Sequence, residues 1–267
     1  MRIGIIGYGD LGKALVKGLT VAGFSQKDID INVRTQKTRD CVRKEYKGIY
    51  VTDNKEELVE RSDVIILVVE PINAKEVLNE IKEYKINGKI FVSFMAGITI
   101  ANIKNMLGEK QNVVKLIRVM PNIAIASGNG VLGVTYEELD YEIIQDVLNV
   151  LKKLGHVLKV DEDSLDYITV TASSGLAFVA CMMNSYQKAS NTLLNDEEKS
   201  KEITICIFEN IINMVKEEEC SFDDIICRIT TRGGTTEAGM KSLNHELITE
   251  ALERCMKKSY EKTQNII

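Results

Sequence analysis

Residues 3–12 read Ile-Gly-Ile-Ile-Gly-Tyr-Gly-Asp-Leu-Gly, a short apolar run that leads directly into the pattern G-x-G-x-x-G. The apolar run predicts a buried strand. The residues after it predict a helix, because Leu11, Leu15 and Leu19 recur at intervals of four. A glycine pattern alone is weak, since glycine-rich turns arise by chance. Its position between a strand and a helix indicates the first βα turn of a dinucleotide-binding fold.

The three glycines have separate tasks in such a turn. Gly7 permits the tight bend, Gly9 leaves room for a pyrophosphate, and Gly12 allows helix and strand to pack closely. Free amides at the start of the helix, at Asp10 and Leu11, provide the positive end that an anion needs. We therefore expect these five residues to bind a dinucleotide, the alternative being a purely structural turn.

The end of the second predicted strand indicates which dinucleotide binds. An NAD site usually has an Asp or Glu about 20 residues past the glycines. This chain has Val33-Arg34-Thr35-Gln36-Lys37 there, which offers a guanidinium, a hydroxyl and an ammonium group. Such groups suit a 2′-phosphate. Arg34 and Thr35 therefore predict NADPH, with NADH possible; the alternative is that Arg34 and Lys37 are solvated loop charges.

Apolar runs alternate with amphipathic stretches through the first part of the chain, which is typical of repeated βαβ units. The predicted strands are residues 3–6, 29–33, 64–69, 90–94, 113–119, 131–134 and 157–160, with a helix at 138–154. After about residue 161 only helical patterns remain, at 165–194 and 203–215. The predicted fold class is α/β: a Rossmann-type doubly wound sheet, followed by an all-helical C-terminal domain.

We expect a dinucleotide-binding domain at residues 1–160 and a helical domain for substrate binding and dimerisation at 161–267. The helical part has more apolar positions than one small domain can bury, which favours a homodimer or larger homo-oligomer. The alternative is a self-sufficient helical bundle.

Composition argues against several classes of protein. The 267 residues carry a formal net charge of -5 with acids and bases interspersed, so no nucleic-acid partner is expected. No apolar run reaches the roughly 18–20 residues of a membrane span, and Met1-Arg2 leads into a strand instead of a signal peptide. A cytoplasmic protein without a membrane partner is expected. The six cysteines form no C-x-x-C pair and the two histidines are far apart, so we expect no metal and mostly buried, reduced cysteines.

Three further motifs extend along the chain. They are S-F-M-A-G at 93–97, R-V-M-P-N at 118–122 and T-T-R-G-G-T-T at 230–236. Together with the glycine turn they resemble the pyrroline-5-carboxylate reductase family over nearly the whole chain. The resemblance implies an oxidoreductase of proline biosynthesis, which reduces the cyclic imine 1-pyrroline-5-carboxylate to L-proline with NADPH or NADH.

The resemblance also implies roles for particular residues. The implied catalytic residues are Thr236, as a hydrogen-bond donor or proton relay at the imine nitrogen, and Glu219, near the substrate. Further implied coenzyme contacts are Val69, Pro71, Ala96, Gly97, Met120, Pro121 and Asn122. The implied substrate contacts are Ser174, Thr231, Arg232, Gly233, Gly234 and Thr235.

The chain departs from the family pattern where the substrate is expected. Glu70 stands where the family has a lysine, residues 173–177 read S-S-G-L-A instead of G-S-G-P-A, with Ser173 and Leu176 altered, and Arg232 replaces a proline. Arg232 either binds an anion or points into solvent. Two alternatives therefore stand beside pyrroline-5-carboxylate reduction: a reductase of another small imino or keto acid, and a non-catalytic, cofactor-binding paralogue.

Overall fold

The computed structural model describes residues 1–137, 141–243 and 245–264. The chain forms two compact units, which we call the sheet unit (Met1–Ser174 with Lys258–Ile267) and the helical unit (Gly175–Lys257). The division therefore falls after Ser174 and not after residue 160. The reason is that Leu165 and Val170 are buried in the sheet unit, where Gly133 leaves room for Leu165.

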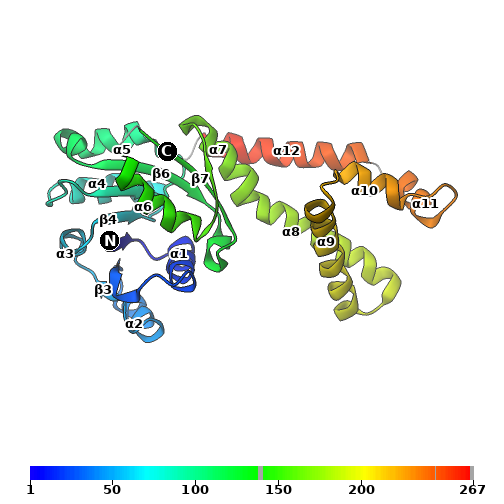
Figure 1. Ribbon diagram of the computed structural model, residues 1–267, viewed down its shortest axis with the longest axis horizontal. Helices are drawn as coiled ribbons and strands as arrows, with labels where there is room; N and C mark the ends of the chain where they lie inside the picture. Colours follow the sequence, from blue (N-terminus) through cyan, green and yellow to red (C-terminus); the bar gives the residue numbers. More distant parts are fainter. Residues whose placement is uncertain (138–140, 244, 265–267) are drawn as a thin grey trace. The chain divides into compact units, whose positions relative to one another are not determined.

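The sheet unit is built on an eight-stranded sheet with the order β3-β2-β1-β4-β5-β6-β7-β8 (Figure 1). Its strands are β1 (Ile3–Ile6), β2 (Ile29–Asn32), β3 (Tyr50–Thr52), β4 (Val64–Leu67), β5 (Ile90–Ser93), β6 (Lys115–Pro121), β7 (Gly130–Tyr136) and β8 (Gly155–Lys159). Strands β1 to β6 are parallel, while β7 is antiparallel to β6. The Rossmann-type prediction is confirmed. Only β3 was missed, because three residues give too short an apolar run.

Helices cover both faces of the sheet. One face packs against α1 (Asp10–Val21), α2 (Gln36–Glu45) and α6 (Tyr141–Lys152). The other packs against α3 (Lys55–Arg61), α4 (Ala74–Ile81) and α5 (Ile100–Leu107). Short helical turns are η1 (Gln26–Asp28), η2 (Pro71–Asn73), η3 (Gly108–Val113), η4 (Ile123–Ser127) and η5 (Glu162–Ser164). The predicted helix at 138–154 begins outside the described residues, and its described part is α6.

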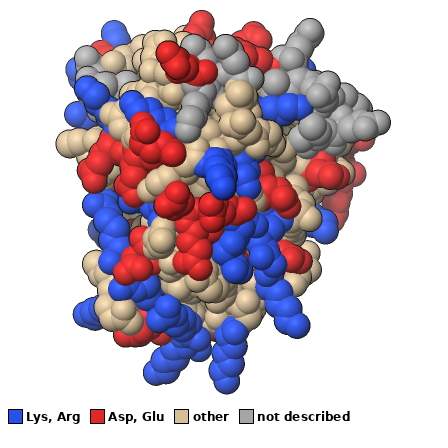
Figure 2. Space-filling view, turned by 90° about the vertical axis from the view of Figure 1, so that its left-hand side faces the viewer, with Lys and Arg blue, Asp and Glu red and all other residues tan. Residues whose placement is uncertain are grey.

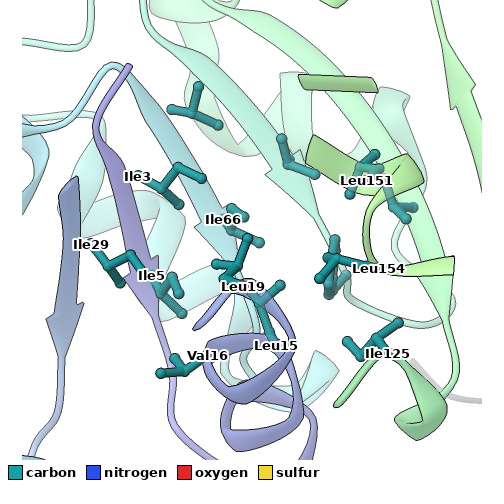
Figure 3. Packing of buried hydrophobic residues seen from close by; sticks show 14 of the residues in the cluster. Ile3, Ile5, Leu15, Val16, Leu19, Ile29, Ile66, Ile125, Leu151 and Leu154 are labelled. Atoms are coloured by element: carbon teal, nitrogen blue, oxygen red, sulfur yellow. The ribbon is translucent and has the colours of Figure 1, made fainter. Parts of the chain in front are cut away.

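The predicted apolar row of α1 lies in the core. Leu15 and Leu19 face Ile5 and Ile66 of the sheet (Figure 3). Gly18 brings the same helix close to η4, because a Cβ at Gly18 would lie 2.2 Å from the Ile125 carbonyl oxygen. Helix α1 therefore connects the glycine turn to the segment that follows β6.

The long predicted helix at 165–194 consists of three parts: α7 (Leu165–Ile168), the π-helical segment η6 (Thr169–Ser174) and α8 (Gly175–Leu194). The helical unit continues with α9 (Glu197–Glu218), α10 (Phe222–Ile229), α11 (Thr235–Ser242) and α12 (His245–Thr263), whose last residues belong to the sheet unit. The all-helical prediction is confirmed.

The helical unit leaves many large apolar side chains exposed. They are Leu176, Val179, Met182, Tyr186, Leu193, Leu194, Ile203, Ile205, Ile212, Phe222, Ile226, Ile229, Leu243, Leu247 and Ile248. In the described part of this unit, Ile225 is the one large apolar side chain that is buried. A self-sufficient bundle would bury more, so this surface favours association.

Two observations bear on the composition arguments. The helical stretch 162–194 is, among the described residues, the one segment long and apolar enough to cross a membrane. The cysteines are free, but the prediction that most are buried is wrong, because four are exposed and Cys220 and Cys255 are partly exposed. All except Cys41 lie in the helical unit, which buries few side chains by itself.

Candidate active site

The glycine turn between β1 and α1 leaves an open cradle. A Cβ at Gly7 would lie 2.1 Å from the Val68 carbonyl oxygen, and one at Gly12 would lie 2.6 Å from the Gly7 carbonyl oxygen. A Cβ at Gly9 would meet no atom within 4 Å. Gly7, whose φ is 108°, and Gly12 are therefore required by backbone packing, whereas Gly9 faces free space that a side chain would fill.

Helix α1 begins at this cradle without a side-chain cap. Its N-cap residue is Gly9, so the first-turn amides of Asp10, Leu11 and Gly12 have no side-chain acceptor from the N-cap. The Asp10 carboxylate is almost fully exposed and lies 3.3 Å from the Lys13 ammonium. Uncapped amides beside open space fit a diphosphate, so the residues present are suited to a dinucleotide.

A cavity of about 310 Å³ extends from the cradle to the end of β2. Five predicted coenzyme residues line it: Gly7, Gly9, Arg34, Thr35 and Val69. Further lining residues that the sequence did not indicate as ligands are Ile6, Tyr8, Asn32, Val33, Thr38, Lys55, Val68, Asn73 and Val77; Glu70 also lines it. Asp10, Leu11, Gly12 and Pro71 lie within three positions of a lining residue in the sequence but do not line the cavity.

Polar residues at the end of β2 and in the loop before α2 line this cavity. Thr35 is the N-cap residue of α2: its Oγ1 accepts a hydrogen bond from the Thr38 amide at 3.3 Å and lies 2.8 Å from the Thr38 hydroxyl. Asn32 is buried and donates from Nδ2 to the Thr52 carbonyl oxygen at 3.3 Å. No carboxylate from this loop lines the cavity among the described residues, in agreement with the sequence.

Other cavity residues set its electrostatics. Burial raises the pKa of Tyr8 to about 12, with smaller contributions from Glu45 and Cys41, so a neutral phenol lines the cavity. The Lys55 ammonium lies 2.6 Å from Glu80. Glu70 is exposed and adds a negative charge where the family pattern has a lysine. No sequence signal pointed to Lys55, because its place at the cavity depends on α3 packing beside β1 and β2.

The R-V-M-P-N segment forms most of β6 and continues to Asn122, which is 5% exposed. The Asn122 side chain accepts hydrogen bonds from the amides of Ala124, at 3.2 Å, and Val131, at 3.3 Å. Its Nδ2 donates to the Ala172 carbonyl oxygen at 3.0 Å, and the Ser173 hydroxyl donates to the Pro121 carbonyl oxygen at 2.9 Å. These contacts fix the end of β6 to η6. Short π-helical segments are frequent at functional sites.

Arg118 is a buried residue of β6 that contacts the segment before η6. Its side chain is 2% exposed, and its guanidinium lies 3.3 Å from Glu162 and 3.6 Å from Asp166. The same Glu162 carboxylate accepts a hydrogen bond from the Ile100 amide at 2.7 Å. Arg118 therefore fixes the segment that leads to η6 against β6 and α5.

The remaining predicted coenzyme residues lie at the C-terminal ends of the central strands. Ala96 and Gly97, with a φ of 71° at Gly97, follow β5, which neighbours β6 and thus Met120 and Pro121. Ligands of open α/β sheets bind at this edge. Ser174, an implied substrate contact, ends η6, and its hydroxyl lies 3.3 Å from that of Ser259.

In the helical unit, the T-T-R-G-G-T-T segment forms a tight turn before α11. The Gly234 amide donates to the Thr231 carbonyl oxygen at 3.0 Å, and Gly233 has a φ of 74°. A Cβ at Gly234 would lie 2.6 Å from the Thr231 hydroxyl oxygen. Both glycines are therefore required. Arg232 occupies the second position of this turn, which proline favours, so the family's proline fits the same backbone.

The helix that follows begins with the two threonines of the motif. Gly234 is the N-cap residue of α11 and provides no side-chain cap to Thr235 and Thr236. One amide of the turn is already satisfied, because the Gly233 N–H donates to Glu237 Oε2 at 2.9 Å. An internal carboxylate thus occupies a donor that the resemblance assigns to the substrate carboxylate.

Two predicted residues stand apart from these contacts. Arg232 is exposed and forms no ion pair with any described residue. Glu219 is an exposed non-glycine residue with a φ of 51°, at the end of α9. No hydrogen bond between described residues joins Glu219 to the turn. Nearby in sequence, the buried Thr230 hydroxyl has no hydrogen-bond partner in the described part of the chain.

Among the described residues, no cluster of three or more His, Cys, Asp or Glu side chains could hold a metal ion.

Comparisons with known proteins cover both units. Residues 2–97 match the family described as NADP oxidoreductase coenzyme F420-dependent, and residues 162–266 match pyrroline-5-carboxylate reductase dimerisation. Pyrroline-5-carboxylate reductase of Aquifex aeolicus is 28% identical over 100% of this chain and 97% of its own length. Pyrroline-5-carboxylate reductase 2 of Bacillus subtilis is 29% identical over 99% and 95%.

Solved structures agree on the fold. The Plasmodium falciparum pyrroline carboxylate reductase with NADP bound has a TM-score of 0.87 at 23% identity, covering 100% of this chain and 98% of that one. The Coxiella burnetii pyrroline-5-carboxylate reductase has a TM-score of 0.86 at 24% identity, covering 99% and 98%. With the dimerisation match and the relatives along the whole length, the resemblance is confirmed: the chain belongs to the pyrroline-5-carboxylate reductase family.

Proposed function

We propose that this chain is an oxidoreductase that reduces 1-pyrroline-5-carboxylate to L-proline with NADPH. The observation that carries this proposal is the similarity to relatives named pyrroline-5-carboxylate reductase along the entire chain. The two most specific motifs of the sequence also form ordered features in the structure, at the end of β6 and at the turn before α11.

The coenzyme proposal rests on the sheet unit. Gly7, Gly9 and Gly12, with the first amides of α1 at Asp10 and Leu11, would hold the diphosphate. Arg34 and Thr35 would hold the 2′-phosphate, because they line the cavity and, among the described residues, the loop between β2 and α2 brings no carboxylate to it. The remaining proposed contacts are Val69, Pro71, Ala96, Gly97, Met120, Pro121 and Asn122. When bound, the coenzyme supplies a hydride, and NADH would supply the same chemistry.

The proposed substrate contacts follow from the chemistry of an imino acid. The uncapped amide of Thr235 at the start of α11 and the Thr231 hydroxyl suit a carboxylate. Gly233 and Gly234 are proposed contacts as well, and their amides would have to exchange their present acceptors, Glu237 and the Thr231 carbonyl oxygen, for the substrate. We assign Ser174 and Arg232 to the same substrate. A protonated imine needs little acid catalysis, so orientation carries most of the task.

Thr236 is the proposed hydrogen-bond donor or proton relay at the imine nitrogen. A threonine hydroxyl is too weak an acid to donate a proton unaided, so solvent or prior protonation of the imine supplies it. Glu219 is proposed to act near the substrate, and its left-handed backbone conformation is one that non-glycine residues seldom adopt.

We further propose a cytoplasmic homo-oligomer assembled through the helical unit. The exposed apolar side chains of α8 and α9 support it, as does the match of residues 162–266 to a dimerisation family. A second subunit would cover the apolar helix at 162–194. A nucleic-acid partner is not proposed, since Lys and Arg lie among Asp and Glu on the face shown in Figure 2.

A second candidate function is reduction of a different small imino or keto acid. Glu70, Leu176 and Arg232 favour it, because they change charge and shape at positions where the family pattern is otherwise fixed. Oxidation of NADPH, followed by absorbance with pyrroline-5-carboxylate and then with a panel of imino and keto acids, tests both. Turnover of the first substrate supports the main proposal, and turnover only of another supports the second. Coenzyme binding without any turnover would indicate a non-catalytic paralogue.

A further inference from the structure

Helix α2 carries an arginine whose guanidinium binds the loop between β2 and α2. Arg39 Nη1 donates to the carbonyl oxygens of Val33 and Arg34, each at 3.0 Å. Its Nε and Nη2 both donate to Gln36 Oε1, at 3.2 and 2.7 Å. The side chain is only 12% exposed. One guanidinium therefore holds three of the four residues from Val33 to Gln36 in place.

These bonds decide which way the peptide groups of the loop point. In a trans peptide the C=O and the following N–H point in opposite directions. Because Arg39 binds the carbonyls of Val33 and Arg34, the N–H groups of Arg34 and Thr35 are directed away from Arg39. Neither amide has a hydrogen-bond acceptor among the described residues.

Residues of the same loop line the cavity. Its lining includes Val33, Arg34, Thr35 and Thr38, whereas Arg39 and Gln36 are not part of it. Arg39 therefore supports the loop from behind. Two free amides, the Arg34 guanidinium and the Thr35 and Thr38 hydroxyls are left for an anion in the cavity.

The charge of Arg39 is already balanced by a carboxylate. Its Nη1 lies 2.8 Å from Asp53 Oδ2, and Asp53 itself is largely exposed. An ion pair of this kind weakens the field that Arg39 exerts on the cavity. The fixed orientation of the loop is then the main effect that Arg39 can have on a bound anion.

We infer that Arg39 is a positioning residue that determines the selectivity for a 2′-phosphorylated coenzyme, by holding the loop so that its amides and Arg34 face the 2′-phosphate. This inference rests on the proposed use of NADPH. Arg39 touches neither coenzyme nor substrate in this scheme, and it acts through Arg34 and Thr35. No local pattern in the sequence indicates this role, because Arg39 lies inside a helix that otherwise has the composition of a charged surface segment.

The test uses the adenosine ends of the two coenzymes as probes. Binding of 2′,5′-ADP and 5′-AMP to the full chain is measured by calorimetry for wild type, Arg39→Met, Arg39→Lys and Arg43→Met. Arg43 is the matched control, since it lies on the same helix and donates to the Val51 carbonyl oxygen at 2.9 Å instead of to the loop. Thermal melting of each variant reports on folding.

Both Arg39 variants should lose about tenfold or more of their affinity for 2′,5′-ADP while keeping that for 5′-AMP, and Arg43→Met should resemble wild type. Lysine retains the charge but cannot bind two carbonyls and Gln36 together. Wild-type selectivity in Arg39→Lys would therefore overturn the inference in favour of a simple charge effect. Equal losses for both probes would overturn it in favour of a structural role. A wild type without preference for 2′,5′-ADP would instead refute the NADPH proposal, and this inference with it.

Discussion

The side-chain amide of Asn122 donates a hydrogen bond at 3.0 Å to the carbonyl oxygen of Ala172, 50 residues along the chain. This bond joins the end of β6 to a turn of η6, whose backbone carbonyls do not follow the α-helical pattern. With the bond from Ser173 to Pro121, it places two sequence motifs of the family against each other. The contact is internal to the sheet unit.

Replacing Asn122 by alanine should lower the free energy of unfolding by about 2–3 kcal/mol. The partly buried amides of Ala124 and Val131 would lose their acceptor, and the Ala172 carbonyl would lose its donor. Urea unfolding measures the change. Ser127→Ala is the control, because that exposed hydroxyl bonds the neighbouring Ala124 carbonyl, and it should change stability by less than about 0.5 kcal/mol. Similar values for both variants would contradict the role assigned to Asn122.

Replacing Thr236 by alanine should lower kcat about tenfold or more, while the affinity for NADPH stays close to that of wild type. A hydrogen bond to the imine nitrogen matters most during the reaction, so its loss affects the rate and not coenzyme binding. Steady-state kinetics and coenzyme titration give the two quantities. Thr192→Ala, on the exposed side of α8, should leave both unchanged. An unaltered kcat would remove Thr236 from the mechanism.

Replacing Glu237 by glutamine should lower the KM for pyrroline-5-carboxylate several-fold and leave kcat nearly unchanged. The Glu237 carboxylate accepts the hydrogen bond of the Gly233 amide, so it would compete with and repel a substrate carboxylate that binds at this turn as proposed. Lys241→Met is the control: it removes the partner 3.3 Å from Glu237 but keeps the carboxylate on the amide. An increase of KM in Glu237→Gln would show that the carboxylate supports the turn instead of competing for it.

Replacing Arg34 by alanine should weaken NADPH binding by about tenfold or more and leave NADH binding within a factor of about two. The guanidinium lines the cavity, and only NADPH has a 2′-phosphate for it to bind. Fluorescence titration with each coenzyme measures the effect. If the variant binds NADPH as tightly as wild type does, Arg34 is a solvated loop residue.

The free energy of unfolding should fall at alkaline pH, because Tyr8 loses its proton more readily in the unfolded chain than in the folded one. Burial raises its pKa from 10.0 to about 12, so the folded state retains the proton over a range in which the unfolded chain loses it. This contribution is complete below pH 10 and is lost as the pH rises towards 12. Unfolding free energies at pH 9 and pH 11 should therefore differ more for wild type than for Tyr8→Phe. Equal differences would show that other groups cause the decline.

Much of the site could be predicted from local sequence. Gly7, Gly9 and Gly12 are recognisable because each is required by backbone geometry within one turn, and the structure shows an open cradle at Gly9. Arg34 and Thr35 could be predicted as coenzyme contacts because the second strand lies beside the first in this fold, which brings its end close to the glycine turn. The G-G-T-T turn is likewise local, with Gly233 at positive φ.

Other parts of the site depend on contacts between distant segments. Lys55 and Asn73 reach the cavity only because α3 and the end of β4 pack beside β1. The occupation of the Gly233 amide by Glu237 depends on how α11 begins, and the choice of carbonyls by Arg39 depends on how α2 lies against its loop. Side-chain partners of this kind leave no periodic signal in the sequence.

The sequence alone determined the βαβ order, the glycine turn, the family and the helical character of the C-terminal part, because apolar periodicity and glycine requirements act over short distances. Only the tertiary structure decided where the compact units divide, what Arg118 binds, and which peptide carbonyls Arg39 holds. Arg118 is an example: the sequence shows it only as the first residue of the motif at 118–122, whereas its buried ion pairs with Glu162 and Asp166 are made across 44 and 48 positions of the chain. Such pairs form only once the sheet has brought these segments together, and no local pattern encodes them.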